Sequence, residues 1–272
     1  MNQIDQAKAH LKEHKLSEAL ECCEQCEESE EKSELRQKIL KYKEINRRIG
    51  EACVLGRDGY CCIKRKPDFA IEKLTKAIEV AFDQNVADYI DECVPNDVRR
   101  TCVDLNRTEL YTWRAEAYLE KNDYDAAIAD FTKVIEHFDP PMLNFHAGFC
   151  YYQRAETYLK KGCYDIAIEE LAKLKLMTDG KVCFNWNSEV LTISAEAYFE
   201  KAKSSFESGD YGFSYECCEK ALEMLQNDWS ELWRHVKGKH SPEDSWEHCR
   251  YKKIEGLKKE IVELKASIAE LQ

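Results

Sequence analysis

The feature that most restricts the fold of this chain is a pattern of tyrosines and small residues that occurs three times. The three copies occupy residues 110–136, 151–177 and 198–224. Each copy has a tyrosine near its start, a small residue four positions later, and a second tyrosine after a short polar turn. The residues in these columns are Tyr111, Tyr151 and Tyr198; Ala115, Ala155 and Ala202; and Tyr124, Tyr164 and Tyr211. The pattern therefore predicts three copies of one structural unit.

Each copy is predicted to form two amphipathic helices joined by a turn, which in the first copy lies at residues 121–123. A small residue in the middle of a helix allows two helix axes to approach closely, and the aromatic residue after the turn packs between one unit and the next. A hairpin of this size cannot bury its apolar face alone. Several hairpins must therefore stack on one another.

This arrangement resembles the tetratricopeptide repeat (TPR), a family of helix-turn-helix units. The resemblance implies an all-α fold, a right-handed superhelical solenoid of TPR-like repeats followed by a C-terminal helix. It also implies that the first helix of each repeat lines a concave surface that binds a protein or peptide.

The columns of the pattern divide the chain into an array at residues 1–242 and a C-terminal helix at 243–272. We expect degenerate copies near 4–28 and 50–81, and clear copies near 108–138, 148–178 and 195–226. A helix at residues 30–49 is either the first helix of an extra hairpin or an extension of its neighbour, and glycines 50, 56 and 59 punctuate the segment after it.

The copies are spaced more widely than the roughly 34 residues typical of the repeat. The largest surplus lies at residues 82–108. This segment is predicted to carry a short helix on each side of Pro95, as a connector or as a functional insertion.

Exposed positions on the predicted first helices are the candidate partner-binding residues. They are Glu109, Thr112, Glu116 and Glu120 in the first clear copy, Phe149, Tyr152, Glu156 and Lys160 in the second, and Glu196, Phe199, Lys203 and Phe206 in the third. Relatives that hold chaperone C-terminal tails use basic and amide side chains here as a carboxylate clamp. Glu116 and Glu156 occupy positions where such a clamp needs donors, which disfavours that ligand. Acidic and aromatic residues together favour a basic or amphipathic peptide, while the alternative is that the glutamates are ordinary solvated residues.

Composition narrows the classes of partner. The 272 residues include 40 Lys and Arg against 52 Asp and Glu, a net charge of −12, and no long basic run. We therefore expect no nucleic-acid partner and no membrane partner. The N-terminal residues lack a signal peptide and no stretch is long enough to span a bilayer, which predicts a cytoplasmic protein.

The 14 cysteines are scattered, mostly on apolar helical positions, which indicates reduced thiols that pack in the core. His10 and His14 with Cys22 and Cys26 come nearest to a zinc-ligand set, but zinc motifs generally place their cysteine pair on a turn. We therefore predict no metal site and no cofactor. Because the sequence contains no phosphate-binding loop, His-Glu-x-x-His or nucleophile-elbow motif, we also predict no catalytic residues and no enzyme activity.

Isoleucine and leucine alternate at three-and-four spacing in the last predicted helix, at Ile254, Leu257, Ile261, Leu264, Ile268 and Leu271. This spacing is typical of a two-stranded coiled coil and predicts a possible homodimer through residues 254–271. The alternative is a helix that caps the final repeat. The sequence thus predicts a protein-interaction scaffold or adaptor that binds a peptide or partner protein in its groove. The second hypothesis is a peptide-sensing regulator that homodimerises through the C-terminal helix.

Overall fold

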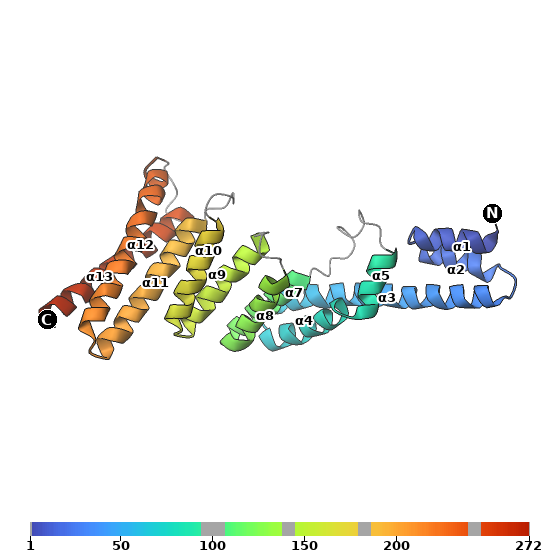
Figure 1. Cartoon of the computed structure of the whole chain (residues 1–272), viewed down its shortest axis with the longest axis horizontal. Helices are drawn as coiled ribbons and strands as arrows, with labels where there is room; N and C mark the ends of the chain where they lie inside the picture. Colours follow the sequence, from blue (N-terminus) through green and yellow to red (C-terminus); the bar gives the residue numbers. More distant parts are fainter. Residues whose placement is uncertain (1, 94–106, 138–144, 179–185, 239–245, 272) are drawn as a thin grey trace. The chain divides into compact units, whose positions relative to one another are not determined.

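The computed structural model describes residues 2–93, 107–137, 145–178, 186–238 and 246–271. Within these ranges all regular secondary structure is helical, which confirms the predicted all-α fold (Figure 1). The helices are α1 (Gln3–Lys12), α2 (Leu16–Glu24), α3 (Glu30–Cys62), α4 (Pro67–Ala81), α5 (Gln84–Cys93), α7 (Arg107–Glu120), α8 (Tyr124–His137), α9 (Phe145–Lys160), α10 (Tyr164–Thr178), α11 (Trp186–Glu207), α12 (Tyr211–Gly238) and α13 (Trp246–Leu271).

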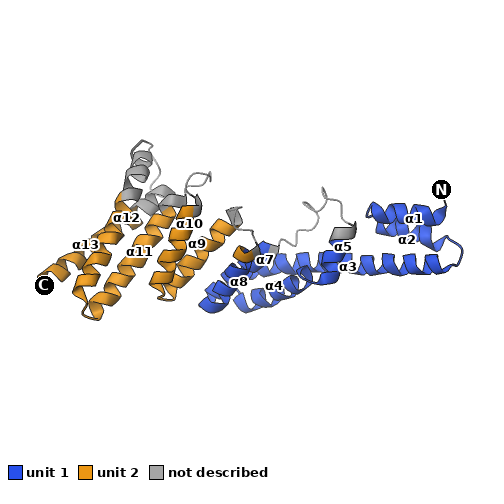
Figure 2. Cartoon of the chain, in the orientation of Figure 1, with its two compact units in different colours: residues 1–134 blue, residues 135–272 orange. Residues whose placement is uncertain are grey.

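The chain forms two compact units, residues 1–134 and residues 135–272 (Figure 2). In the first unit α1 packs on α2, α3 on α4, and α4 on α7. In the second unit each helix from α9 to α13 packs on the next, and α13 also touches α11. Packing between neighbours in the chain is the arrangement expected for stacked hairpins. The handedness of the superhelix stays a prediction.

The three turns inside the clear copies share one backbone feature. The middle residue of each turn has a left-handed backbone, with φ of 58° at Asn122, 82° at Gly162 and 84° at Gly209. Glycine and asparagine adopt this conformation at least cost, so they end the first helix of each hairpin. Asp123 then caps the start of α8, because its Oδ1 accepts a hydrogen bond of 3.3 Å from the Ala126 backbone N–H.

Helix α3 decides between the two alternatives for the helix at 30–49. It runs without interruption over 33 residues, past the glycines at 50, 56 and 59, so the helix at 30–49 is an extension of its neighbour. Glycines occur inside this helix because other helices pack closely against it. A Cβ on Gly56 would lie 2.9 Å from Leu110 Cδ2 on α7, and one on Gly59 would lie 2.7 Å from Leu74 Cγ on α4. These glycines let two helices approach α3.

Two predicted connecting segments lie partly outside the described residues. Before Pro95 a short helix is present, α5, but residues 94–106 are not described. The interruption predicted near residues 178–187 falls between the end of α10 and the start of α11, and residues 179–185 are not described.

The small residues of the repeated pattern lie in the core, as close helix packing requires. Ala115, Ala155 and Ala202 are fully buried, as are Ala127 and Ala167 on the second helices. In the third copy a serine replaces this second alanine. Ser214 is also fully buried, and its hydroxyl donates a 2.7 Å hydrogen bond to the Ala202 carbonyl across the hairpin. The bond satisfies the buried hydroxyl, so serine is tolerated there.

A buried ion pair joins the two helices of the first two clear copies. On α7 and α8, Arg114 Nε and Nη2 each donate a 2.7 Å hydrogen bond to the Asp130 carboxylate. Sixteen residues also separate Arg154 on α9 from Glu170 on α10, and Arg154 Nε donates at 3.0 Å. Their side chains are at most 16% exposed. Both pairs therefore fix how the first helix lies against the second.

The third copy lacks this pair. Lys201 occupies the arginine column and buried Cys217 occupies the acid column. The Lys201 ammonium instead pairs with Asp165 on α10, and it lies 4.8 Å from the centre of the Phe213 ring. Because its own hairpin has no acid in the equivalent column, Lys201 connects the third copy to the second through Asp165.

Candidate functional site

A cavity of the second unit lies between the α9–α10 turn, α11 and α13. Its volume is about 810 Å³, within the range of about 300–1,000 Å³ usual for ligand pockets. Residues that line it are Leu159, Lys160, Lys161, Gly162, Tyr164, Glu196, Phe199, Glu200, Lys252, Lys253, Gly256, Leu257 and Glu260. Apolar side chains and charges of both signs therefore share one recess.

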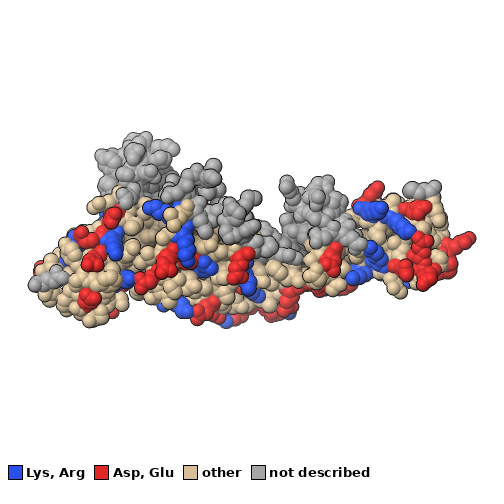
Figure 3. Space-filling view, in the orientation of Figure 1, with Lys and Arg blue, Asp and Glu red and all other residues tan. Residues whose placement is uncertain are grey.

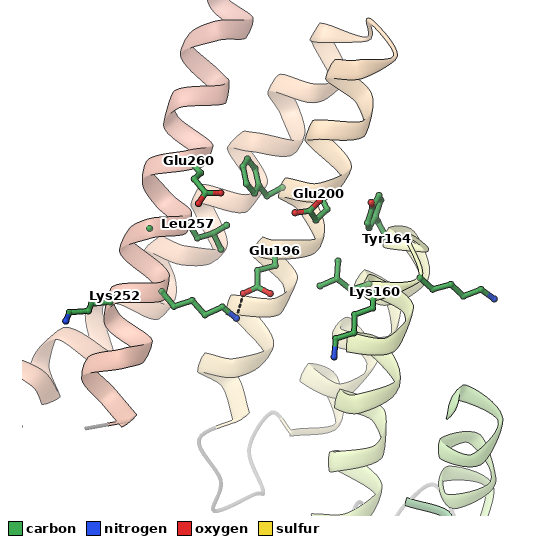
Figure 4. Close-up of a pocket in the computed structure, with 13 residues that line it drawn as sticks. Lys160, Tyr164, Glu196, Glu200, Lys252, Leu257 and Glu260 are labelled. Atoms are coloured by element: carbon green, nitrogen blue, oxygen red, sulfur yellow. Dashed lines mark ion pairs between the residues drawn. The ribbon is translucent and has the colours of Figure 1, made fainter. Parts of the chain in front are cut away.

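Each wall of the cavity follows from a local feature of the sequence. The left-handed Gly162 ends α9, so that Lys160 and Tyr164 lie on either side of the turn. Figure 4 shows Leu257 and Glu260 of α13 facing Glu196 and Glu200 of α11, whereas Lys252 points away from α11. Helix α13 is held there because Ile254, Ile261 and Ile268 are fully buried with α11 and α12 residues.

Ion pairs hold most of the charged lining residues in place. Glu196 Oε1 lies 2.5 Å from Lys253 Nζ and joins α11 to α13 (Figure 4). Lys160 pairs with Glu156 at 3.1 Å, one turn away on α9, and Lys203 pairs with Glu200 on α11. Glu196 Oε1 is buried and has no well-aligned hydrogen bond within the described residues, so Lys253 compensates its charge only by proximity.

Two residues of α13 in this cavity, Glu260 and Gly256, are available for contact with a ligand. Glu260 is exposed and makes no ion pair with another described residue. A Cβ placed on Gly256 would meet no atom within 4 Å. Glycine inside a helix costs about 0.5–1 kcal/mol relative to alanine. The space above Gly256 is thus open on the cavity side of α13.

Of the candidate partner-binding residues, Lys160, Glu196 and Phe199 line this cavity. Phe199 is nearly buried, at 5% exposure, and its ring lies 4.8 Å from the Lys203 ammonium. Phe206 packs on Tyr211 with ring centroids 5.4 Å apart. On α9, Tyr152 packs against the core around Leu171, and Phe149 is half-buried.

The other four candidates, on α7, lie in the first unit. Thr112 is satisfied by its own helix, since its hydroxyl donates a 2.8 Å hydrogen bond to the Thr108 carbonyl. Glu109 is half-buried and Glu120 is exposed. Glu116 is half-buried, and burial raises the pKa of its carboxyl above the usual value, with Glu120 adding repulsion and Lys64 opposing the shift. Burial therefore makes the charged form of Glu116 less favourable in the folded chain than in water.

Replacing Glu116 by glutamine is expected to stabilise the first unit at neutral pH. Because the folded-state pKa is raised, the folded chain binds the proton more tightly than the unfolded chain does. The contribution of Glu116 to stability is thus greatest below pH 4.5 and falls as the pH rises through the folded-state value. Urea denaturation should show that Glu116→Gln exceeds wild type at about pH 7 and equals it near pH 4. Glu79→Gln, at an exposed position of α4, is the control for the loss of one negative charge. An equal gain in stability in that variant would show that burial of Glu116 is not the cause.

Sequence reasoning missed the contribution of α13 to the cavity. It used this helix only for its alternating isoleucines and leucines. Lys253, Leu257 and Glu260 recur at spacings of four and three, which places the two charged residues on one helical face with Leu257 of that apolar stripe. This spacing was the available signal, but the position of α13 beside α11 was needed to interpret it.

Surface charge alone does not distinguish the two units. On the face shown in Figure 3, Lys and Arg side chains are interspersed with Asp and Glu side chains. On this face, attraction to a partner must therefore come from particular side chains rather than from a continuous charged patch.

The thiols whose side chains the structure describes are free, and burial makes Cys217 and Cys218 poor nucleophiles. Burial raises the pKa of Cys217, and it raises that of Cys218 to about 11, with the neighbouring thiol adding to the shift. Among the described residues no His, Cys, Asp and Glu side chains group as three or more metal ligands. His14 instead lies beside Tyr89, whose hydroxyl is 3.1 Å from the ring Nδ1.

The part of the chain that the structure describes holds no helix with the length and apolar character needed to cross a bilayer.

Comparison with known proteins gives a family match for part of the first unit. Residues 108–136 match the family model described as tetratricopeptide repeat. No curated protein sequence matches the chain. Among solved structures, the crystal structure of the P58(IPK) TPR domain matches with 15% sequence identity and a TM-score of 0.38, covering 97% of this chain and 79% of that one.

Proposed function

We propose that this chain, which is a tetratricopeptide repeat protein and as such a scaffold for protein–protein interaction, binds an amphipathic segment of a partner in the cavity of its second unit. The family match lies on α7 and α8 and supports the general role. The observation that carries the finer proposal is the cavity bounded by α9, α11 and α13, whose lining includes three candidate residues predicted from sequence, Lys160, Glu196 and Phe199.

The chemistry of the lining favours an amphipathic segment over a purely basic one. Leu159, Phe199 and Leu257 offer apolar contacts within the cavity. Lysines and glutamates surround them, and most of these already pair with each other. A segment with an apolar stripe flanked by charges of both signs matches this arrangement, because it buries apolar area while its charges meet opposite charges at the rim.

A larger side chain at Gly256 would fill part of the cavity, and it should block peptide binding without destabilising the fold. The Gly256→Leu side chain would project into open space, and leucine favours a helix over glycine by about 0.5–1 kcal/mol, so the variant should be slightly more stable than wild type. Peptides are first selected from a random display library on the full-length chain. We expect a set of these to lose at least about tenfold in affinity for Gly256→Leu, because the new side chain occupies their site.

Ala266→Leu is the matched control, since it adds a leucine side chain at an exposed position of α13 outside the cavity. It should leave peptide affinity unchanged. If every selected peptide binds Gly256→Leu as tightly as wild type, the cavity is not the binding site.

The second candidate function is a regulator that homodimerises through residues 254–271. In the structure the three isoleucines of that stripe are fully buried within one chain, against α11 and α12. Residues buried in this way are unavailable to a second chain unless α13 detaches. This observation favours the capping role for α13.

A further inference from the structure

Two aromatic rings meet on the surface of the first unit, at the end of α3 and the middle of α7. The ring centroids of Tyr60 and Trp113 are 4.9 Å apart, with an interplanar angle of 41°. Tyr60 is 52% exposed, whereas Trp113 is half-buried and packs on the core. Gly56, one turn before Tyr60, allows α7 to approach this closely, because a Cβ there would lie 2.9 Å from Leu110 Cδ2. The pair is therefore a preformed aromatic surface, fixed from beneath by helix packing.

Glu116 lies one helical turn after Trp113, on the same side of α7. It makes no hydrogen bond or ion pair with another described residue, although burial disfavours its charged form. Lys64 lies in the turn that follows α3, four residues after Tyr60, and acts on Glu116 through its charge without forming an ion pair with it. The carboxylate is thus partly desolvated and lacks a close cation.

Comparison with the next copy shows that the environment of Glu116 on α7 is different. The residue equivalent to Glu116 in the next copy is Glu156, which pairs with Lys160 one turn later at 3.1 Å. On α7 the position of that lysine is occupied by Glu120, which adds negative charge instead. The position of Trp113 is occupied by Gln153 in the next copy. The copy on α7 therefore has no internal cation at this position and carries an aromatic ring beside it.

We propose that Tyr60, Trp113 and Glu116 form a subsite for a lysine or arginine side chain of a partner protein. The side chain lies over the exposed ring face, and its cationic group pairs with Glu116. A cation within about 6 Å of an aromatic ring is attracted by the ring quadrupole, and the carboxylate supplies the opposite charge. The inference rests on the proposed role as a protein-binding scaffold and adds a second, chemically defined contact on the first unit.

The test compares how tightly matched peptides bind the full-length chain. Peptides are selected from a display library, and those that bind Tyr60→Leu more weakly than wild type are kept. Each of these is then resynthesised with one basic residue at a time replaced by norleucine. We expect one Lys or Arg in these peptides whose replacement lowers affinity by about tenfold or more in wild type and has little effect in Glu116→Gln. Lys64→Gln, which removes the nearby competing cation, should increase the preference for the basic peptide.

Glu79→Gln is the control for net charge and should keep the full preference. Circular dichroism and urea denaturation of each variant show that it is folded. The proposal is overturned if Tyr60→Leu weakens no peptide, if no basic residue matters in those it weakens, or if Glu116→Gln keeps the preference. Gly256→Leu should leave the preference intact, so failure of the cavity in the second unit and failure of this subsite give different results.

Discussion

Replacing Asp130 by alanine is expected to lower the free energy of unfolding of the first unit by about 3–5 kcal/mol. The change leaves the Arg114 guanidinium, whose side chain is 16% exposed, without the carboxylate that accepts two of its hydrogen bonds. Thr75 Oγ1, which accepts a third bond at 3.0 Å, cannot neutralise the charge. Urea denaturation would measure the loss, and hydrogen exchange of α7 and α8 would locate it.

A double replacement distinguishes the charge from the packing. Arg114→Met with Asp130→Leu removes both charges and keeps apolar volume, so it should recover most of the stability, because a buried ion pair is often no better than a well-packed apolar pair. Glu51→Ala, which breaks the exposed pair with Arg47, should cost less than about 1 kcal/mol. A loss at Asp130 no greater than the loss at Glu51 would show that the pair is not effectively buried in solution.

Removing residues 239–272 is expected to destabilise the second unit severely in a monomeric protein. Three fully buried isoleucines, Ile254, Ile261 and Ile268, would be lost, and each contributes about 1.5–3 kcal/mol of burial. The truncation would also expose Cys218, Ala221 and Leu225, which are buried in the same cluster. Hydrogen exchange should show reduced protection of α11 and α12, and analytical ultracentrifugation should show a monomer before and after truncation.

A point variant makes the same test without deleting a helix. Ile261→Ala should cost about 2–5 kcal/mol by creating a cavity in the core. Its neighbour Val262 is 52% exposed, so Val262→Ala should change stability by less than about 0.5 kcal/mol. If residues 254–271 instead pair two chains, wild-type stability will rise with protein concentration, and truncation will halve the mass while both units stay folded. That result would replace the cap with a dimer.

The sequence was sufficient for the local elements of the fold. The spacing of Tyr111, Ala115 and Tyr124 and its recurrence predicted the hairpins, because helix contacts within a hairpin connect residues close in the chain. The turn predicted at residues 121–123 marked the end of α7 for the same reason. The sequence left open whether the helix continues past Gly50, since glycine weakens a helix locally, whereas Gly56 and Gly59 allow close contacts with later helices.

Only the tertiary structure decided which side chains meet. The 16-residue spacing of Arg114 and Asp130 is visible in the sequence, but their burial and bidentate geometry depend on how two helices cross. The recess between α11 and α13 joins Glu196 to Lys253, which lie more than fifty residues apart. Tyr60 and Trp113 likewise meet only because α3 continues past its glycines and packs on α7. Helix periodicity is a property of neighbouring residues, whereas a binding surface is made where distant helices pack together.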